Sequence, residues 1–433
     1  FTMTGLALYR GITSLGRPFI NYYLHRRMAQ GKEHPERFPE RQGQASRVRP
    51  IGPLAWIHAA SVGEAQSALT LIHHMLRRRT DLHILVTTGT ITSAKILSDR
   101  LPARSFHQFI PVDRIGWVRR FLDHWDPDFA IWVESEFWPN LIHETADRNI
   151  PIALVNGRIS RKSVANWHQA PGFIRGVLSC FRLCLTQTEE EASRFKGLGA
   201  TRVICHGNLK YSAEPLPVDE VEWDRMSAEI SGRPVWLAAS THPGEEDLAA
   251  EAHLKIKTAH PDLLTIIIPR HPNRGPKVAA MLTARGLKVG LRSMGAPIDS
   301  NHEIHVANTL GELGLFYRLA SIAFIGGSMF DHGGHNPLEA AQLDCTILHG
   351  PDMANFRTVA IELKAAHGAV EVTGTAALAE AVVWLLKTPE EAVKIAKSAA
   401  EVAAKNYAVV DQVMESLIPF LDAMPHEDPY AGA

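Results

Sequence analysis

Short apolar runs alternate with amphipathic segments of helical length along most of the chain. Such alternation predicts an α/β fold, in which parallel strands are covered by helices. The strands expected in the first half of the chain are residues 54–58, 84–87, 105–110, 129–133, 152–155, 183–186 and 203–206. Those expected in the second half are residues 235–239, 264–268, 287–289, 304–306, 322–325, 346–348 and 369–372.

The alternation breaks at residues 211–219, where two prolines stand among polar residues. Proline interrupts helices and central strands, so this stretch is the predicted interdomain linker. A length of 433 residues also favours two domains. We therefore expect an N-terminal segment (1–30), a first Rossmann-like domain (31–212) and a second one (213–433) whose last helix could return to the first. Two such domains facing across a cleft would suit a nucleotide-linked substrate, because open α/β sheets bind ligands beyond the carboxyl ends of their strands.

Composition narrows the class of protein. Hydrophobic residues make up 45% of the chain and charged residues 21%, which is typical of soluble globular proteins and argues against disorder and a multi-pass membrane protein. The formal net charge of −1 gives no reason to expect a nucleic-acid partner, although residues 22–49 are rich in arginine. The four cysteines lack metal-ligand spacing, and we expect core thiols and no metal site.

The N-terminal segment carries an apolar and aromatic stripe at helical spacing, interrupted by Arg10 and Arg17. Two arginines argue against a membrane span of roughly 20 apolar residues, but they suit a helix that lies in the membrane interface. The alternative is a helix packed on its own domain. The residues of the stripe are Leu6, Tyr9, Ile12, Leu15, Phe19 and Tyr23.

A glycine-rich stretch, residues 326–339, follows an apolar run and precedes a helix-like segment. Glycines let the backbone approach a ligand, and free N–H groups at a helix start favour a phosphate. Asn336 and Glu339 stand within one helical turn and would suit a base or ribose hydroxyls. The alternative is a tight turn with a capping or solvated glutamate. The predicted nucleotide contacts are Gly326, Gly327, Ser328, Gly333, Gly334, Asn336, Pro337, Leu338 and Glu339.

Polar motifs also follow the strands of the first half. Ser61 and Glu64 have the spacing of a capping box, but a carboxylate in this place could equally accept a proton from an incoming hydroxyl. Spacing alone leaves both interpretations open. A single cation after a strand is usually solvated, whereas two converging on a carboxylate indicate a polar substrate pocket. The candidate residues of this half are Ser61, Gly63, Glu64, Glu134, Arg158 and Lys210.

Comparable motifs follow the strands of the second half. An arginine there offers the planar fork that binds phosphate at two points, and a histidine adds a donor. A loop made rigid by prolines is the alternative. A glycine before another helical stretch could supply backbone N–H groups to the same site. The candidate residues are Ser240, His242, Arg270, His271, Gly311, Glu312 and Leu313.

These motifs resemble, in the same order, those of the 3-deoxy-D-manno-octulosonic acid (Kdo) transferases. The matching motifs are residues 58–64, 134–140, 156–160, 207–210, 269–272, 311–313 and 333–339. The resemblance implies a GT-B fold and an inverting glycosyltransferase that moves Kdo from its donor substrate, CMP-Kdo, to the lipid A precursor (lipid IVA) in lipopolysaccharide assembly. It also implies a place at the cytoplasmic face of the inner membrane. We expect no cofactor.

By position, Glu64 resembles the catalytic base of that family, and Glu134 and Lys210 resemble residues that stabilise its transition state. The second-half motifs resemble its contacts with CMP. A sugar hydroxyl is a poor nucleophile until a base takes its proton, and CMP leaves as an anion that cations stabilise. Two rival interpretations are a GT-B-like sugar-nucleotide epimerase and a non-catalytic nucleotide- or lipid-binding module.

Overall fold

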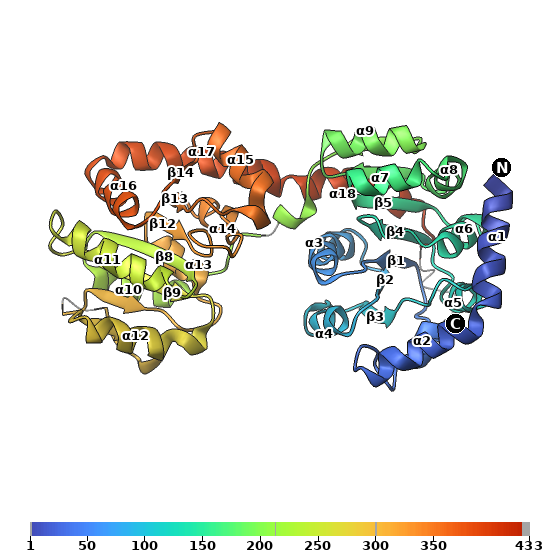
Figure 1. The fold of residues 1–433 in the computed structure, drawn as a ribbon, viewed down its shortest axis with the longest axis horizontal. Helices are drawn as coiled ribbons and strands as arrows, with labels where there is room; N and C mark the ends of the chain where they lie inside the picture. The colour runs from blue at the N-terminus through green and yellow to red at the C-terminus, as the bar shows by residue number, and fades with distance from the viewer. Residues whose placement is uncertain (1, 213, 299–300, 427–433) are drawn as a thin grey trace. The chain divides into compact units, whose positions relative to one another are not determined.

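The computed structural model describes residues 2–212, 214–298 and 301–426. Over this part of the chain it contains two compact units, each with a seven-stranded sheet (Figure 1). Unit 1 comprises Phe1–Ala213 and Ala408–Ala433, and unit 2 comprises Glu214–Tyr407. The chain thus completes unit 2 before its last helix, α18 (Val409–Asp422), returns to unit 1.

The sheet of unit 1 has the strand order β3-β2-β1-β4-β5-β6-β7, with all neighbouring strands parallel. The order reverses between β1 and β4, which pair directly. Such a reversal opens a crevice at the carboxyl ends of the two strands, where open α/β sheets bind ligands. The strands are β1 (Leu54–His58), β2 (His83–Thr88), β3 (Ser105–Phe109), β4 (Phe129–Val133), β5 (Ile152–Gly157), β6 (Leu183–Thr186) and β7 (Val203–Cys205).

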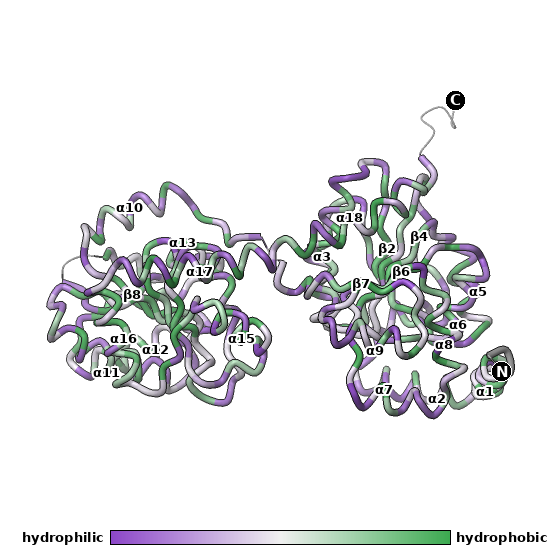
Figure 2. Tube along the Cα trace, turned by 90° about the horizontal axis from the view of Figure 1, so that it is seen from above, coloured by the Kyte–Doolittle hydropathy of each residue, from purple (hydrophilic) through white to green (hydrophobic). Residues whose placement is uncertain are grey.

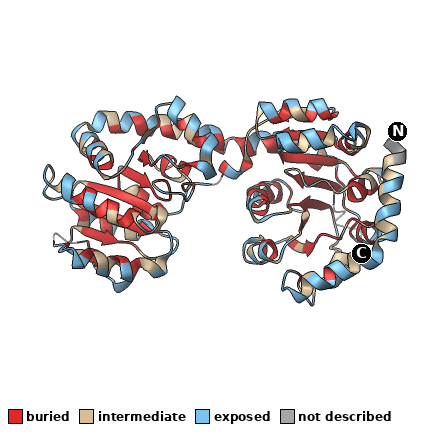
Figure 3. Cartoon of the chain, in the orientation of Figure 1, coloured by how far each residue is buried: buried red, intermediate tan, exposed pale blue. Residues whose placement is uncertain are grey.

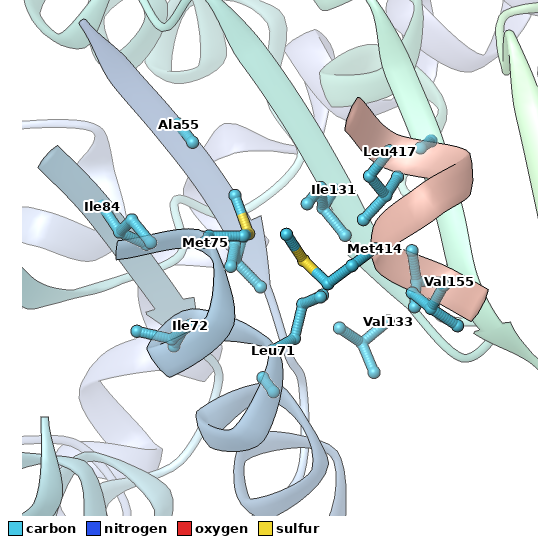
Figure 4. Close-up of a cluster of buried hydrophobic side chains, with 14 of the residues drawn as sticks. Ala55, Leu71, Ile72, Met75, Ile84, Ile131, Val133, Val155, Met414 and Leu417 are labelled. Carbon is cyan, nitrogen blue, oxygen red and sulfur yellow. The ribbon is translucent and has the colours of Figure 1, made fainter. Parts of the chain in front are cut away.

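Helices cover both faces of this sheet, because successive strand residues point to opposite sides. Ile57 and Ile131 point to the face covered by α3 (Val62–Arg78), α4 (Ile91–Arg100) and α18, where Met414 and Leu417 lie beside the strands (Figure 4). Trp56 and Trp132 point to the other face. That face is covered by α5 (Ile115–Trp125), α6 (Pro139–Asp147), α8 (Pro171–Ser179) and α9 (Glu189–Leu198), and α7 (Arg161–Trp167) lies beside α9.

The sheet of unit 2 is also parallel, with the order β10-β11-β9-β8-β12-β13-β14. Here the order of the chain breaks between β8 and β12, which pair directly. The strands are β8 (Val235–Thr241), β9 (Leu264–Pro269), β10 (Val289–Leu291), β11 (Ile304–Val306), β12 (Ile322–Ile325), β13 (Thr346–His349) and β14 (Ala369–Glu371).

The strands of unit 2 are buried beneath its helices, as Figures 2 and 3 show by hydropathy and by burial. Trp236 and Phe324 lie in a core that α11, α12 and α16 enclose. The helices are α10 (Glu220–Ile230), α11 (Glu245–Lys257), α12 (Gly275–Ala284), α13 (Leu313–Leu319), α14 (Leu338–Ala341), α15 (Arg357–Ala365), α16 (Thr375–Lys387) and α17 (Pro389–Tyr407).

The predicted α/β fold is confirmed, and each expected strand has a counterpart within a few residues. The largest displacement is at residues 287–289, since β10 begins at Val289. The apolar runs predicted the strands well because nearly all of them are covered on both faces, which requires continuous apolar sequence.

The N-terminal segment forms two helices, α1 (Thr2–Leu15) and α2 (Arg17–Ala29). Helix α1 packs on unit 1: the hydroxyl of Tyr9 donates to Asp113 Oδ2 at 2.9 Å, and Arg10 Nη2 lies 2.8 Å from Glu144 Oε1. The packed-helix alternative is therefore correct for the side of α1 that carries Tyr9 and Arg10. No helix among the described residues has the length and apolar character needed to cross a membrane.

The predicted single stripe is wrong in one respect. Three successive three-residue steps, from Leu6 to Leu15, turn the side chains by about 180° around a helix. Leu6 and Tyr9 therefore lie on the inner side, while the later members point outward. The outward side carries a surface that we call the α1–α2 apolar surface. Its residues are Leu8, Ile12, Leu15, Phe19, Tyr22 and Tyr23, all between 58% and 84% exposed.

Candidate functional site

Several predicted site residues lie at the two strand pairs where the sheets change order. In unit 1, Glu64 follows β1 and Glu134 follows β4. In unit 2, Ser240 lies near the end of β8 and Gly326 follows β12. Each unit therefore places its motif residues where its own sheet is built to receive a ligand.

Glu64 lies in the first turn of α3 and is 9% exposed. Its Oε2 accepts from the backbone N–H of Ala60 at 2.7 Å, and its Oε1 accepts from the hydroxyl of Ser61 at 2.9 Å. Ser61 in turn accepts from the N–H of Glu64, so the capping interpretation is confirmed. Burial raises the pKa of Glu64 above its ordinary value, although both hydrogen bonds oppose the rise. A carboxylate with a raised pKa is also a stronger base.

Glu134 has a backbone φ of 63°, a left-handed conformation that is uncommon outside glycine. Its N–H donates to the carbonyl of Val155 at 3.0 Å, which fixes the end of β4 against β5. Burial, followed by the charge of Glu64, raises the pKa of Glu134 to about 7. Strained backbone of this kind is found most often at functional sites.

Two cations lie near Glu134. The charges of Arg158 and Lys210 both oppose the rise in its pKa, and both side chains are exposed. Asn156 connects them to the sheet, because its Oδ1 accepts from the N–H of Leu209 at 3.0 Å. The structure thus brings Glu64, Glu134, Arg158 and Lys210 together, whereas Gly63 is an exposed backbone position with no neighbour in reach of an added Cβ.

Glu136 belongs to this group, although the sequence interpretation did not include it among the site residues. Its Oε2 lies 3.6 Å from Nε2 of the fully buried His58, and His58 Nδ1 lies 3.1 Å from Thr87 Oγ1. Burial acts against ionisation, but His58 and then Trp138 and Arg41 lower the pKa of Glu136 overall. The sequence feature that could have identified Glu136 is its position two residues after Glu134, beyond the end of the same strand.

Several backbone N–H groups of the glycine-rich loop of unit 2 donate to partners within the protein. The N–H groups of Gly327 and Met329 donate to the carboxylate of Glu245, at 2.7 and 3.1 Å. Those of Gly333 and Gly334 donate to Asp352 Oδ2 and to the carbonyl of Gly327. Glu245 is fully buried, so the protein supplies its own anion to this loop. The following helix, α14, has only four residues and offers little dipole.

Close packing explains two other positions of the loop. A Cβ at Gly326 would overlap the carbonyl oxygen of Ser240, so β8 and β12 need glycine there. Ser328 is fully buried and accepts from the N–H of Gly350 at 2.7 Å, which gives it a structural place. Ser240 itself has a φ of 57° and, like Glu134 and Asn156, is a non-glycine residue in a left-handed conformation at a strand end.

Histidines form the polar surface above this loop. His242 Nε2 lies 3.0 Å from His335 Nε2, and the ring of His242 stacks on that of His332 at 4.2 Å. His271 lies further off, with ring centres 6.3 Å from His242. Burial, then the charges of His242 and Arg270, lower the pKa of His335 to about 4. His335 is therefore neutral near neutral pH. His332 was not among the predicted site residues, although it lies in the same predicted loop.

Arg270 follows β9, and its side chain is exposed beside the histidine cluster. The neighbouring Arg274 is held differently, with Nη1 and Nη2 at 2.7 and 3.1 Å from the buried carboxylate of Glu246. Arg270 is therefore the arginine with its fork turned to solvent, and Arg274 stiffens the loop that carries it.

The remaining candidates of unit 2 are held by local contacts. Asn336 Oδ1 accepts from the N–H of Leu338 at 3.1 Å, and its amide donates to Glu339 at 3.4 Å. Burial raises the pKa of Glu339, while Asn336 and Arg270 oppose the rise. Glu312 lies at the start of α13 and binds Arg292 at two points, at 2.6 and 3.1 Å. Pro337, Gly311 and Leu313 contribute backbone at these turns.

Chemically, unit 1 offers a desolvated carboxylate that can accept a proton, a second carboxylate that titrates near neutral pH, and two cations. Unit 2 offers an exposed guanidinium and four histidines that can neutralise an anion. Within the described ranges, no group of three or more His, Cys, Asp or Glu side chains has the arrangement of a metal site.

Known proteins resemble this chain over most of its length. Residues 36–213 match the family described as 3-deoxy-D-manno-octulosonic-acid transferase (kdotransferase). A 3-deoxy-D-manno-octulosonic acid transferase of Rickettsia felis is 36% identical, over 85% of this chain and 79% of the relative. One of Rickettsia bellii is 33% identical, over 96% of this chain and 99% of the relative. The solved UDP-GlcNAc 2-epimerase of Neisseria meningitidis, bound to UDP-GlcNAc, matches 85% of this chain and 100% of its own with a TM-score of 0.56; at 15% identity, the likeness concerns the fold.

Proposed function

The chain belongs to the 3-deoxy-D-manno-octulosonic acid (Kdo) transferase family, and we propose that it transfers Kdo from CMP-Kdo to the lipid A precursor. In this proposal, unit 1 binds the acceptor and unit 2 binds the donor. The observation that carries it is the pair of carboxylates at the strand reversal of unit 1, the buried Glu64 and the half-buried Glu134, both with raised pKa values.

Glu64 is the proposed general base. An acceptor hydroxyl would lose its proton to Glu64 as its oxygen bonds to the anomeric carbon of Kdo and the bond to the CMP phosphate breaks. Attack from the side opposite CMP would invert the configuration at that carbon. The raised pKa of Glu64 supports this role, because the carboxylate gains more by accepting a proton than an exposed one does. Capping does not compete with it, since each carboxylate oxygen keeps a second lone pair.

Glu134 and Lys210 are proposed to stabilise the transition state. Departure of CMP leaves positive charge on the sugar ring, and a carboxylate beside it lowers the energy of that state. The opposing influences of Glu64 and of the cations on the pKa of Glu134 fit a group whose charge matters during the reaction. Arg158 is suited to the carboxylate that Kdo itself carries.

Arg270 and the histidine cluster are proposed to bind the phosphate of CMP. The N–H groups of Gly327, Met329 and Gly333 are already engaged by Glu245 and Asp352, so in this proposal the side chains supply most of the positive charge there. Asn336 and Glu339 would face the base or the ribose, near Gly311, Glu312 and Leu313. We expect transfer without a divalent ion, since Arg270 and protonated histidines can neutralise the leaving phosphate. Activity that persists in excess EDTA would support this point.

The α1–α2 apolar surface is proposed to hold unit 1 against the cytoplasmic face of the inner membrane. Six exposed apolar or aromatic side chains occur within 16 consecutive residues of α1 and α2, a density that fits contact with a lipid surface. Arg17 and Arg26 are exposed and could meet anionic headgroups. Arg10 and Arg27 are already paired with Glu144 and Glu33, so we expect them to add less attraction to anionic headgroups than the two exposed arginines do.

The direct test is to incubate the protein with CMP-Kdo and tetraacyl lipid A precursor and to weigh the lipid product. A mass increase by one or more Kdo residues, together with release of CMP, is the expected result. Loss of CMP-Kdo without a heavier lipid would mean hydrolysis or isomerisation of the donor, and an unchanged donor would leave binding only. The same experiment also counts the Kdo units added.

A further inference from the structure

A pocket of about 560 Å³ lies in unit 1 between α2 and the loops that follow β1 to β4. Its volume falls within the range of small-molecule sites. One wall comes from α2, with Phe19, Ile20, Tyr23 and Leu24. The opposite wall comes from the loops, and its residues include Ala60, Gly89, Ile110, Val112 and Trp138. Most of the lining is apolar, which distinguishes the pocket from the charged site around Glu134.

The pocket adjoins the proposed base. Ala60 lines it, and the N–H of Ala60 donates to Glu64 Oε2 at 2.7 Å. Glu136 also lines it, with its carboxylate 3.6 Å from His58 Nε2. A ligand that fills the pocket would therefore contact Ala60, which is hydrogen-bonded to Glu64.

The same pocket continues from the α1–α2 apolar surface. Phe19 and Tyr23 belong to both, and their side chains are 79% and 58% exposed. Polar groups are confined to a few lining positions: Arg27, Arg41, Thr90 and Glu136. Arg27 and Arg41 both contact the buried Glu33, at 2.7 and 3.4 Å, which fixes them at the wall. An occupant must thus be apolar along most of its length and polar where it reaches Glu136.

We propose that this pocket binds one acyl chain of the glycolipid acceptor and so sets the distance between the membrane and Glu64. The inference rests on the proposed function and adds the place where one chain of the acceptor binds. A chain that leaves the bilayer for an apolar pocket exchanges one hydrocarbon surrounding for another, so the pocket orients the acceptor without trapping it. A chain that leaves water gains about fourfold in affinity per methylene buried.

The test uses acceptor analogues that stay monomeric in water, namely acylated glucosamine phosphates whose chains lengthen by two methylenes at a time. Binding without donor is measured by titration calorimetry. For the wild type we expect Kd to fall on the order of tenfold per step until the pocket is full. Equal Kd values along the series would overturn the proposal.

Gly89→Leu is the informative variant. A Cβ at Gly89 would meet only the carbonyl oxygen of Ala60, at an ordinary 3.8 Å, so a larger side chain can occupy the pocket without strain. The ratio of Kd between short and long chains should shrink toward one. Gly197→Leu, on the exposed side of α9 with no atom near its Cβ, is the matched control and should keep the wild-type ratio. If Kd changed equally with chain length in wild type and in Gly89→Leu, the acyl chain would bind at another place.

Transfer from CMP-Kdo to the same analogues is measured separately. Transfer that ignores chain length would end the pocket proposal and leave the proposed function intact. Binding that depends on chain length, with no transfer to any acceptor, would support the pocket proposal and contradict the proposed function.

Discussion

The buried carboxylate of Glu245 accepts a hydrogen bond of 2.7 Å from the backbone N–H of Gly327. It accepts two more, from the N–H groups of His242 and Met329. One side chain at the start of α11 therefore holds the glycine-rich loop and the first histidine of the cluster in place. These three hydrogen bonds fix the position from which the loop and His242 present their side chains.

Glu245→Ala should destabilise unit 2 by roughly 3 kcal/mol, because each buried N–H left without a partner costs about 1–3 kcal/mol and entering water recovers part of this. Urea unfolding would measure it. Glu251→Ala on the exposed side of the same helix is the control, with an expected change within about 0.5 kcal/mol. Equal stability of the two variants would contradict the role of Glu245.

Glu64→Gln should lower kcat by roughly 10²–10⁴, the usual share of general-base catalysis, while the amide oxygen still accepts from Ala60. Ser61→Ala is the matched variant, because it removes the side-chain cap and retains the carboxylate. It should lose about 0.5–2 kcal/mol of stability. Comparing turnover and thermal unfolding of both variants separates catalysis from capping. Near wild-type turnover in Glu64→Gln would leave Glu64 with capping alone.

Glu134 makes stability depend on pH. Its pKa in the fold is about 7, above the ordinary 4.5, so between these values the native state binds more protons than the unfolded chain. The contribution of Glu134 to the free energy of unfolding of the wild type therefore falls as pH rises through that window and levels off above it. Glu134→Gln lacks the titration, and its stability relative to wild type should rise by an amount on the order of 1 kcal/mol from pH 4 to pH 8.

The control for this effect is Glu189→Gln, at an exposed position on α9. Its stability relative to wild type should stay level over the same pH range. A flat difference for Glu134→Gln as well would show that the carboxylate titrates normally in the fold.

Arg270→Ala should weaken CMP binding roughly 10- to 100-fold, the value of a charge-assisted hydrogen bond to phosphate. Glu339→Ala should also weaken it, while acceptor binding stays intact in both. Calorimetric titration with CMP measures the change. Arg357→Ala removes an exposed arginine from α15 and is the control for loss of charge in unit 2. If Arg270→Ala bound CMP as tightly as wild type, the nucleotide would bind at another site.

Replacing Leu8, Ile12 and Leu15 by glutamine should reduce co-sedimentation with anionic vesicles and leave unit 1 folded, because these side chains are 61% to 84% exposed. None of the three lines the pocket beside Glu64. Val221→Gln with Val393→Gln removes exposed apolar side chains from unit 2 and should not alter sedimentation. Binding by wild type should weaken with added salt. Unchanged sedimentation of the triple variant would refute the membrane surface.

The strands and the order of the motifs could be predicted from the sequence because both are local properties. A strand covered on both faces needs an apolar run wherever the chain forms it, and Leu54–His58 or Ile322–Ile325 show such a run without knowledge of any neighbour. Motif spacing likewise identified Ser61 and Glu64 as a capping pair. It left the chemical use of Glu64 open, since a carboxylate that caps and one that faces a substrate have the same sequence.

Partners distant in the chain were decided only by the tertiary structure. Nothing near Gly327 in the sequence predicts that Glu245 occupies its N–H, because a hydrogen bond between residues 82 positions apart depends on the pairing of β8 with β12. The same holds for Glu136 and His58, and for the N-terminal stripe. Helical spacing tells which residues share a side, but Tyr9 turns inward because folding brings Asp113 and Phe173 to it, and Ile12 stays outside because nothing in unit 1 covers it.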